Sequence, residues 1–234
     1  GLGACLDRYP DRLVGMGIVP LQDTKLATKE LERLTDELGM PGIEIRSNME
    51  GTYLGDKSLW PFWEAAEALD VLVFVHPDQP IIGEDKLGEY YLGNLVGNPI
   101  ETTRSIADVV FSGVLEAYPR LKICFAHAGG TVPYIRGRFE HGYHVRTEPK
   151  AKIKRPPSEY IKLLYFDTIT HWAPALEFLV NTVGADHVVV GSDYPFDMGP
   201  AEPVRFVEGV PGISAEDKRK ILSENAIRLL KLDA

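Results

Sequence analysis

The sequence predicts an α/β fold built on a parallel β-sheet. Six short apolar runs recur along the 234 residues, and helix-like segments separate them. The runs read as apolar on both faces, which is expected when helices cover a parallel sheet. Strands that alternate with helices favour right-handed parallel crossovers. The predicted strands are residues 13–19, 42–45, 71–75, 121–126, 163–166 and 187–190.

Amphipathic patterns between these runs predict the helices. The predicted helices are residues 25–38, 59–69, 100–118, 174–183 and 218–232. The first opens after Thr24, carries a stripe of leucines and stops at Gly39. The third ends before Pro119, because the residue preceding a proline disfavours the helical conformation. For the last helix, Ser214 and Asp217 resemble a capping box.

Composition excludes several classes of protein. Hydrophobic residues make up 44% and charged residues 25% of the chain, which is ordinary for a globular domain and excludes disordered and coiled-coil classes. The net charge of -9 argues against a nucleic-acid partner, because phosphate binding needs clustered Lys and Arg. We expect no membrane segment, no disulfide framework from two cysteines, a cytoplasmic location and a single domain over residues 1–234.

Titratable side chains follow four of the predicted strands. His76, His127, Asp167 and Asp193 each stand at or just after the carboxyl end of a strand, and those ends meet at one rim of a parallel barrel. Taken alone, His76 fits a structural histidine and Asp193 fits an Asx turn before Pro195. Two imidazoles and a carboxylate at one rim instead favour a divalent metal site.

The number of strands bears on the architecture. Six strands are fewer than the eight of a closed (β/α)₈ barrel, and the chain is shorter than the roughly 250 residues typical of that fold. We therefore expect a TIM barrel that lacks its first two βα units in this sequence. An open sheet of six parallel strands is the alternative.

Several motifs resemble those of the amidohydrolase-related, metal-dependent hydrolase superfamily, and within it the branch of aminocarboxymuconate-semialdehyde decarboxylase. The resemblance covers essentially the whole chain. The motifs are FSGV at 111–114, YPRLK at 118–122, FAHAGG at 125–130, RPPSEY at 155–160, VGSDYPF at 190–196 and ENA at 224–226.

This resemblance implies a site and a quaternary structure. It implies a divalent metal, usually zinc, with His76 and Asp193 among its ligands. It makes His127 the catalytic residue that acts on a water activated by the metal. It also implies a homodimer in which Arg138 reaches the neighbouring subunit's site and pairs with a substrate carboxylate, while Phe196 lines the pocket. The family's His-x-His pair at the first barrel strand is absent from this sequence, in agreement with the strand count.

Three functions remain open at this point. The first is a metal-dependent decarboxylase that needs no organic cofactor and acts on a small unsaturated or aromatic carboxylic acid. The second is a metal-dependent hydrolase, of the lactonase or amidase type, on the same scaffold. The third is an inactive binding or scaffolding subunit, which the missing ligand pair suggests.

Overall fold

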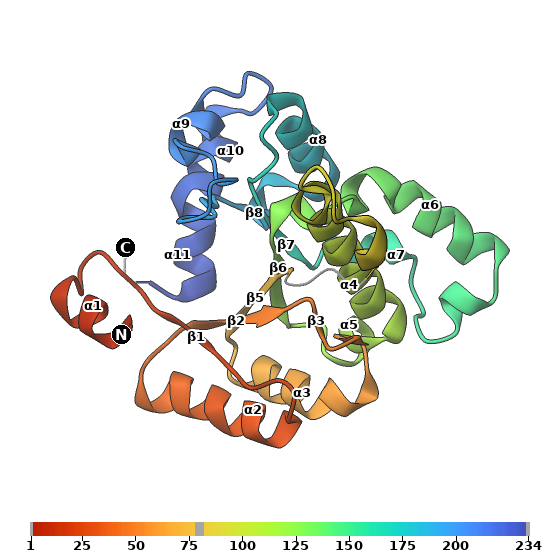
Figure 1. Ribbon diagram of the computed structural model, residues 1–234, viewed down its shortest axis with the longest axis horizontal. Helices are drawn as coiled ribbons and strands as arrows, with labels where there is room; N and C mark the ends of the chain where they lie inside the picture. The colour runs from red at the N-terminus through yellow and green to blue at the C-terminus, as the bar shows by residue number, and fades with distance from the viewer. Residues whose placement is uncertain (1, 78–81, 233–234) are drawn as a thin grey trace.

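The centre of the molecule is a parallel sheet of six strands that follow one another in chain order (Figure 1). The computed structural model describes residues 2–77 and 82–232. The strands are β1 (Met16–Ile18), β2 (Gly42–Arg46), β5 (Leu72–His76), β6 (Lys122–Phe125), β7 (Tyr165–Asp167) and β8 (Val188–Val189). A short antiparallel pair, β3 (Asn48–Met49) and β4 (Thr52–Tyr53), follows β2.

This topology confirms the predicted fold class. Every predicted run overlaps one strand, although β2, β5 and β7 each end one residue later than predicted, and all five pairings in the main sheet are parallel. Parallel strands in chain order, each connected through helical segments, are the arrangement found along a (β/α)₈ barrel. Within the described residues, β1 and β8 form the two edges of the sheet.

Helices surround the sheet. They are α1 (Leu2–Arg8), α2 (Thr24–Glu32), α3 (Trp60–Ala68), α4 (Asn98–Ser112), α5 (Val114–Ala117), α6 (Val132–Val145), α7 (Pro157–Ile161), α8 (Ala173–Val183), α9 (Pro203–Glu208), α10 (Ala215–Arg219) and α11 (Asn225–Leu230). In Figure 1, α2 and α3 lie at one end of the sheet, and α8 to α11 lie at the other. None of the helices in the described ranges is long and apolar enough to cross a bilayer.

The single helix predicted over residues 100–118 is wrong. The chain forms α4 and α5 with a break at Gly113, whose φ is +88°. A Cβ at this position would lie 2.9 Å from the carbonyl oxygen of Lys152. Glycine is therefore required both by the left-handed backbone and by the close approach of a neighbouring segment.

The predicted leucine stripe of the first helix is only half correct. Leu31 and Leu34 are buried, but Leu26 and Leu38 are 55% and 49% exposed. Leu26 precedes Leu31 by five residues, which places the two side chains about 140° apart around an α-helix. Leu38 follows a π-helical turn over Arg33–Glu37, which shifts the register of the buried face.

Side-chain caps fix two helix starts. The Asp23 carboxylate accepts hydrogen bonds from the N–H groups of Lys25 and Leu26, at 2.9 and 3.1 Å. The predicted cap Ser214 is confirmed, because its hydroxyl accepts from the Asp217 N–H at 3.1 Å. The predicted helix over 218–232 is divided into α10, a π-helical turn and α11.

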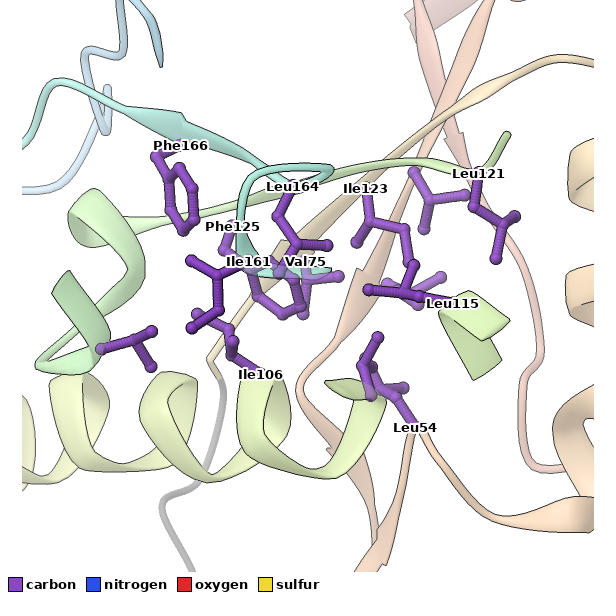
Figure 2. Close-up of a cluster of buried hydrophobic side chains, with 14 of the residues drawn as sticks. Leu54, Val75, Ile106, Leu115, Leu121, Ile123, Phe125, Ile161, Leu164 and Phe166 are labelled. Atoms are coloured by element: carbon purple, nitrogen blue, oxygen red, sulfur yellow. The ribbon is translucent and has the colours of Figure 1, made fainter. Parts of the chain in front are cut away.

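The two faces of the sheet differ in what they contact. Side chains on the outer face pack against the helices, as Figure 2 shows for Val75, Ile123 and Phe125 near Ile106 of α4. The inner face of β2 instead carries charged residues. Burial alternates along that strand, so that the buried residues face the helices and the exposed residues face inward. The expectation that every run is apolar on both faces is wrong for β2, and the exposed positions line the cavity that holds the site.

Candidate metal centre

Three of the predicted site residues converge at the carboxyl ends of the strands. The potential ligand atoms of His76, His127 and Asp193 all lie within 4.8 Å of one another. One carboxylate oxygen of Asp193 is 3.6 Å from Nε2 of His76, and the other is 3.8 Å from Nε2 of His127. The two imidazole rings are 5.1 Å apart in an edge-to-face arrangement. The convergence that the strand ends predicted is confirmed.

His76 is the last residue of β5, and its side chain points to the inner face of the sheet. Its Nε2 atom is buried, and no group in the described part of the chain forms a hydrogen bond with it. The ring of Phe196 stacks on it, with centroids 6.5 Å apart and planes inclined by 14°. A buried imidazole nitrogen without a hydrogen bond, aimed at a carboxylate, is an expected donor to a metal ion.

His127 lies in a tight turn that follows β6. His127 and Ala128 both have a φ of 54°, in a region that non-glycine residues seldom adopt. Asp167, at the end of β7, holds this turn, because its carboxylate accepts from the N–H groups of His127 at 2.9 Å and Ala128 at 2.8 Å. The same carboxylate accepts from the N–H of Ile169 at 2.9 Å. Asp167 therefore fixes the direction in which the His127 ring leaves the backbone.

Burial shifts the pKa of both His127 and Asp167. Desolvation lowers the pKa of His127, which favours the neutral imidazole, although the charges of Asp167 and Asp193 oppose the effect. Desolvation also raises the pKa of Asp167, which is 2% exposed, while its backbone donors and His127 favour the charged form.

Asp193 reaches the site through a short polar turn after β8. Its φ is +52°, a left-handed conformation that Asp tolerates better than most residues. Gly191 allows this segment to pass close to β7, because a Cβ there would lie 2.9 Å from Cβ of Asp167. The Gly191 N–H donates to the Thr168 hydroxyl at 3.2 Å. The Gly-Ser-Asp turn thus places a carboxylate beside the two imidazoles.

The donor set fits a divalent cation. Neutral imidazoles and a carboxylate are suitable ligands for zinc and related first-row metals. The orphaned Nε2 of His76 provides the structural test, because a bound cation would satisfy it. Within residues 2–77 and 82–232, this is the one group of three or more His, Cys, Asp or Glu side chains close enough to hold an ion.

Two cavities meet at this centre. The larger has a volume of 1190 Å³ and is lined by His76, Asp193 and the inner face of the sheet. The second has a volume of 680 Å³ and shares His127 and Asp193 with the first. Its lining is mostly apolar and includes Tyr134 and Trp172. Both are large enough to hold a small organic acid.

The two predicted substrate-binding residues differ in position. Phe196 lines the larger cavity beside His76, as expected for a pocket residue. Arg138 lies on α6, is exposed, and does not line either cavity. It is one turn after Tyr134, so the two side chains share a face of that helix. The structure thus does not bring Arg138 into the site of its own chain.

Two residues of the site were missed as functional candidates. The sequence places Asp167 at a strand end but does not show its role. Its carboxylate positions His127 by accepting hydrogen bonds from backbone N–H groups, and such contacts leave no pattern in the sequence. Arg46 also lines the larger cavity, at the end of β2. The alternation Ile43-Glu44-Ile45-Arg46 was the available signal, since it marks a strand with one charged face.

Comparison with known proteins gives a consistent picture. The sequence profile of a family described as amidohydrolase matches residues 3–232. The chain is 41% identical over 225 residues to 2-amino-3-carboxymuconate-6-semialdehyde decarboxylase of Dictyostelium discoideum. This alignment covers 96% of the present chain and 62% of that protein. It is 30% identical to gamma-resorcylate decarboxylase of a Polaromonas species, over 97% of this chain and 72% of that protein.

A solved structure shares the fold. The crystal structure of a dihydroxybenzoic acid decarboxylase from Polaromonas, with bound manganese and the inhibitor 2-nitroresorcinol, superimposes with a TM-score of 0.90 at 30% identity. It covers all of this chain, and this chain covers 73% of it. The present chain thus spans about three fifths to three quarters of the length of these relatives.

Proposed function

Because the chain belongs to the amidohydrolase family, we propose that it is a metal-dependent decarboxylase of a small unsaturated or aromatic carboxylic acid. The observation that carries the proposal is the convergence of His76, His127 and Asp193 at one rim of the sheet. The relatives support the reaction class, since two of them are named as decarboxylases of different acids.

His76 and Asp193 would hold the cation, which we propose to be zinc. A divalent cation supplies Lewis-acid chemistry when bound, by making a water more acidic or by polarising a substrate oxygen. Manganese, which occupies the Polaromonas structure, is the main competitor for the site. Neutral imidazole and carboxylate ligands suit both ions, so that metal content decides between them.

His127 has the position of a proton carrier. Loss of CO₂ breaks a C–C bond and leaves an electron pair on the carbon that carried the carboxylate, where a proton must be added. We propose that Nε2 of His127, which faces the Asp193 carboxylate at 3.8 Å, first takes this proton from a water and then gives it to that carbon, so that the hydroxide left behind leaves with CO₂ as bicarbonate. The Asp167 carboxylate holds the backbone of the His127 turn, so the ring keeps its orientation when the proton is gained or lost.

The substrate pocket is proposed to be completed by a second copy of the chain. Arg138 would pair with a substrate carboxylate in the partner's site, since its guanidinium can form two parallel hydrogen bonds with that group. An interface at this face is supported by Tyr134, which is one turn before Arg138 on α6 and 83% exposed, and by Trp172, which lines the second cavity with Tyr134 and is 66% exposed. Phe196 would cover one face of the substrate from within the same chain.

Metal content and product analysis test the proposal together. The purified protein is expected to contain, or to bind on titration, one divalent ion per chain. It should release CO₂ from at least one member of a panel that contains 2,6-dihydroxybenzoate and an acyclic unsaturated dicarboxylate. Ring opening of lactones without CO₂ release would instead indicate a hydrolase. A chain that binds no metal would indicate an inactive binding or scaffolding subunit.

A further inference from the structure

The inner face of β2 places a cation beside the metal centre. Arg46 is the last residue of β2, and its register partner on β5 is His76. Register partners in a parallel sheet lie on adjacent strands about 4.8 Å apart and point to the same face. Arg46 is exposed and lines the same cavity as His76 and Asp193. Its guanidinium therefore belongs to the surface that a substrate meets.

Burial along neighbouring strands confirms that this face is the inner one. Ile43 and Ile45 are 1% and 4% exposed and pack into the core, whereas Glu44 and Arg46 are exposed. On β5, Val75 is fully buried, and His76 is less so. The alternation has the same phase on both strands, so Arg46 and His76 share the cavity side of the sheet.

We propose that Arg46 binds the carboxylate of the acid substrate within its own chain and sets the preference for anionic over neutral ligands. This inference rests on the proposed decarboxylase function, which supplies a carboxylic acid as the ligand. A guanidinium presents paired N–H donors that match the two oxygens of a carboxylate. The chain as a whole carries a net charge of -9, so a positive charge on the cavity wall would favour an acid over a neutral ligand there, in addition to the effect of the metal.

Glu44 offers the competing structural explanation. It lies two residues before Arg46 on the same strand face and lines the same cavity. If the only role of Arg46 were to balance this carboxylate, its substitution would lower stability and would change the affinity for all ligands equally. An arginine that binds substrate would matter for acids and leave neutral ligands unaffected. The two roles are thus separated by comparing ligands that differ only in the carboxylate.

The experiment measures binding by calorimetry to the metal-loaded protein. The probes are 2,6-dihydroxybenzoate, cis,cis-muconate as an acyclic unsaturated dicarboxylate, and resorcinol as the ring without a carboxylate. Arg46→Gln is expected to weaken the acid that the wild type binds by about 10-fold or more, while resorcinol binding changes by less than about twofold. Arg46→Lys, which keeps the charge but not the paired donors, should fall between the two.

Controls separate the possible failures. Metal content should be unchanged in Arg46→Gln, and its melting temperature is compared with that of Arg120→Gln, a matched surface variant at the amino end of β6, where Arg120 pairs with Glu67. An equal loss for acids and resorcinol, or no loss for either, would overturn the role of Arg46. If Arg46→Gln does not fold, wild-type affinity in Arg46→Lys would overturn it as well. A metal-loaded wild type that binds neither acid would contradict the proposed substrate class, and the Arg46 proposal with it.

Discussion

The three converging side chains do not have equal roles in the proposed site, although their distances are similar. His76 Nε2 and His127 Nε2 lie 3.6 and 3.8 Å from the Asp193 carboxylate, so geometry alone does not rank them as ligands. The difference lies in their surroundings. Both rings have a buried nitrogen that no described group satisfies, but in His76 it is Nε2, which faces Asp193, whereas in His127 it is Nδ1, and Asp167 holds the His127 turn.

Substitution of the histidines separates metal binding from proton transfer. We expect His76→Ala to weaken zinc or manganese binding by about 100-fold, because it removes a ligand and loss of even an outer-shell partner costs about 10–100-fold. His127→Ala should retain the metal within about threefold and lose most turnover, as general acid–base residues contribute about 10²–10⁴-fold. Metal titration followed by CO₂ release measures both quantities.

His144→Ala is the matched control for these variants, since His144 is exposed on α6, lines neither cavity, and contacts Glu140 and the Tyr143 ring. Its metal affinity and turnover should equal those of the wild type. Equal metal loss in His76→Ala and His127→Ala would show that His127 is a ligand rather than a proton carrier.

Individual site residues could be predicted where chemistry and strand position coincide. His76, His127 and Asp193 have side chains suited to metals and stand at strand ends, so both signals are visible in the sequence. The role of Asp167 was not visible, because its carboxylate acts on backbone N–H groups. Arg46 was overlooked because a charge at the end of an apolar run resembles an ordinary strand boundary.

At the scale of elements, strands were predicted more reliably than helix continuity. A buried parallel strand needs only a short apolar run, which is a local property. The break at Gly113 depends on a segment about 40 residues away, whose Lys152 carbonyl occupies the space next to it. The π-helical turns at Arg33–Glu37 and Lys220–Glu224 likewise interrupt helices that local periodicity reads as continuous.

The junction of α4 and α5 gives a test of this explanation. We expect Gly113→Ala to lower the free energy of unfolding by about 1–3 kcal/mol, because alanine disfavours a φ of +88° and its Cβ would lie 2.9 Å from the Lys152 carbonyl oxygen. Gly137 in α6 is the matched control, since nothing lies within 4 Å of a Cβ built there. Gly137→Ala should be stabilising by about 0.5–1 kcal/mol.

Urea denaturation at constant metal concentration measures both variants. The explanation predicts opposite signs for the two glycines. A Gly113→Ala protein as stable as the wild type would mean that α4 can continue through this residue, and that Lys152 moves aside at no cost.

At the scale of the whole molecule, the order of the strands brings the site residues together. Parallel strands in chain order bring residues 76, 127 and 193 to one rim, although they are 51 and 66 residues apart in sequence. That convergence could be predicted because it follows from topology alone. The position of Arg138 relative to a substrate could not be predicted. Arg138 is exposed on α6, so its role depends on whether a second chain covers that face of the helix.

The proposed dimer makes a quantitative prediction about Arg138. An arginine that serves the partner's site can be rescued in a mixed dimer, whereas an arginine that serves its own chain cannot. We expect Arg138→Gln and His127→Ala each to be nearly inactive alone. A one-to-one mixture with exchanged subunits should recover about a quarter of wild-type CO₂ release, since about half the dimers are mixed and each has one intact site. The intact site combines His127 of the Arg138→Gln chain with Arg138 of the other chain. No recovery, with subunit exchange verified by mass spectrometry, would place Arg138 outside the partner's site, while a monomer in solution would exclude the shared site altogether.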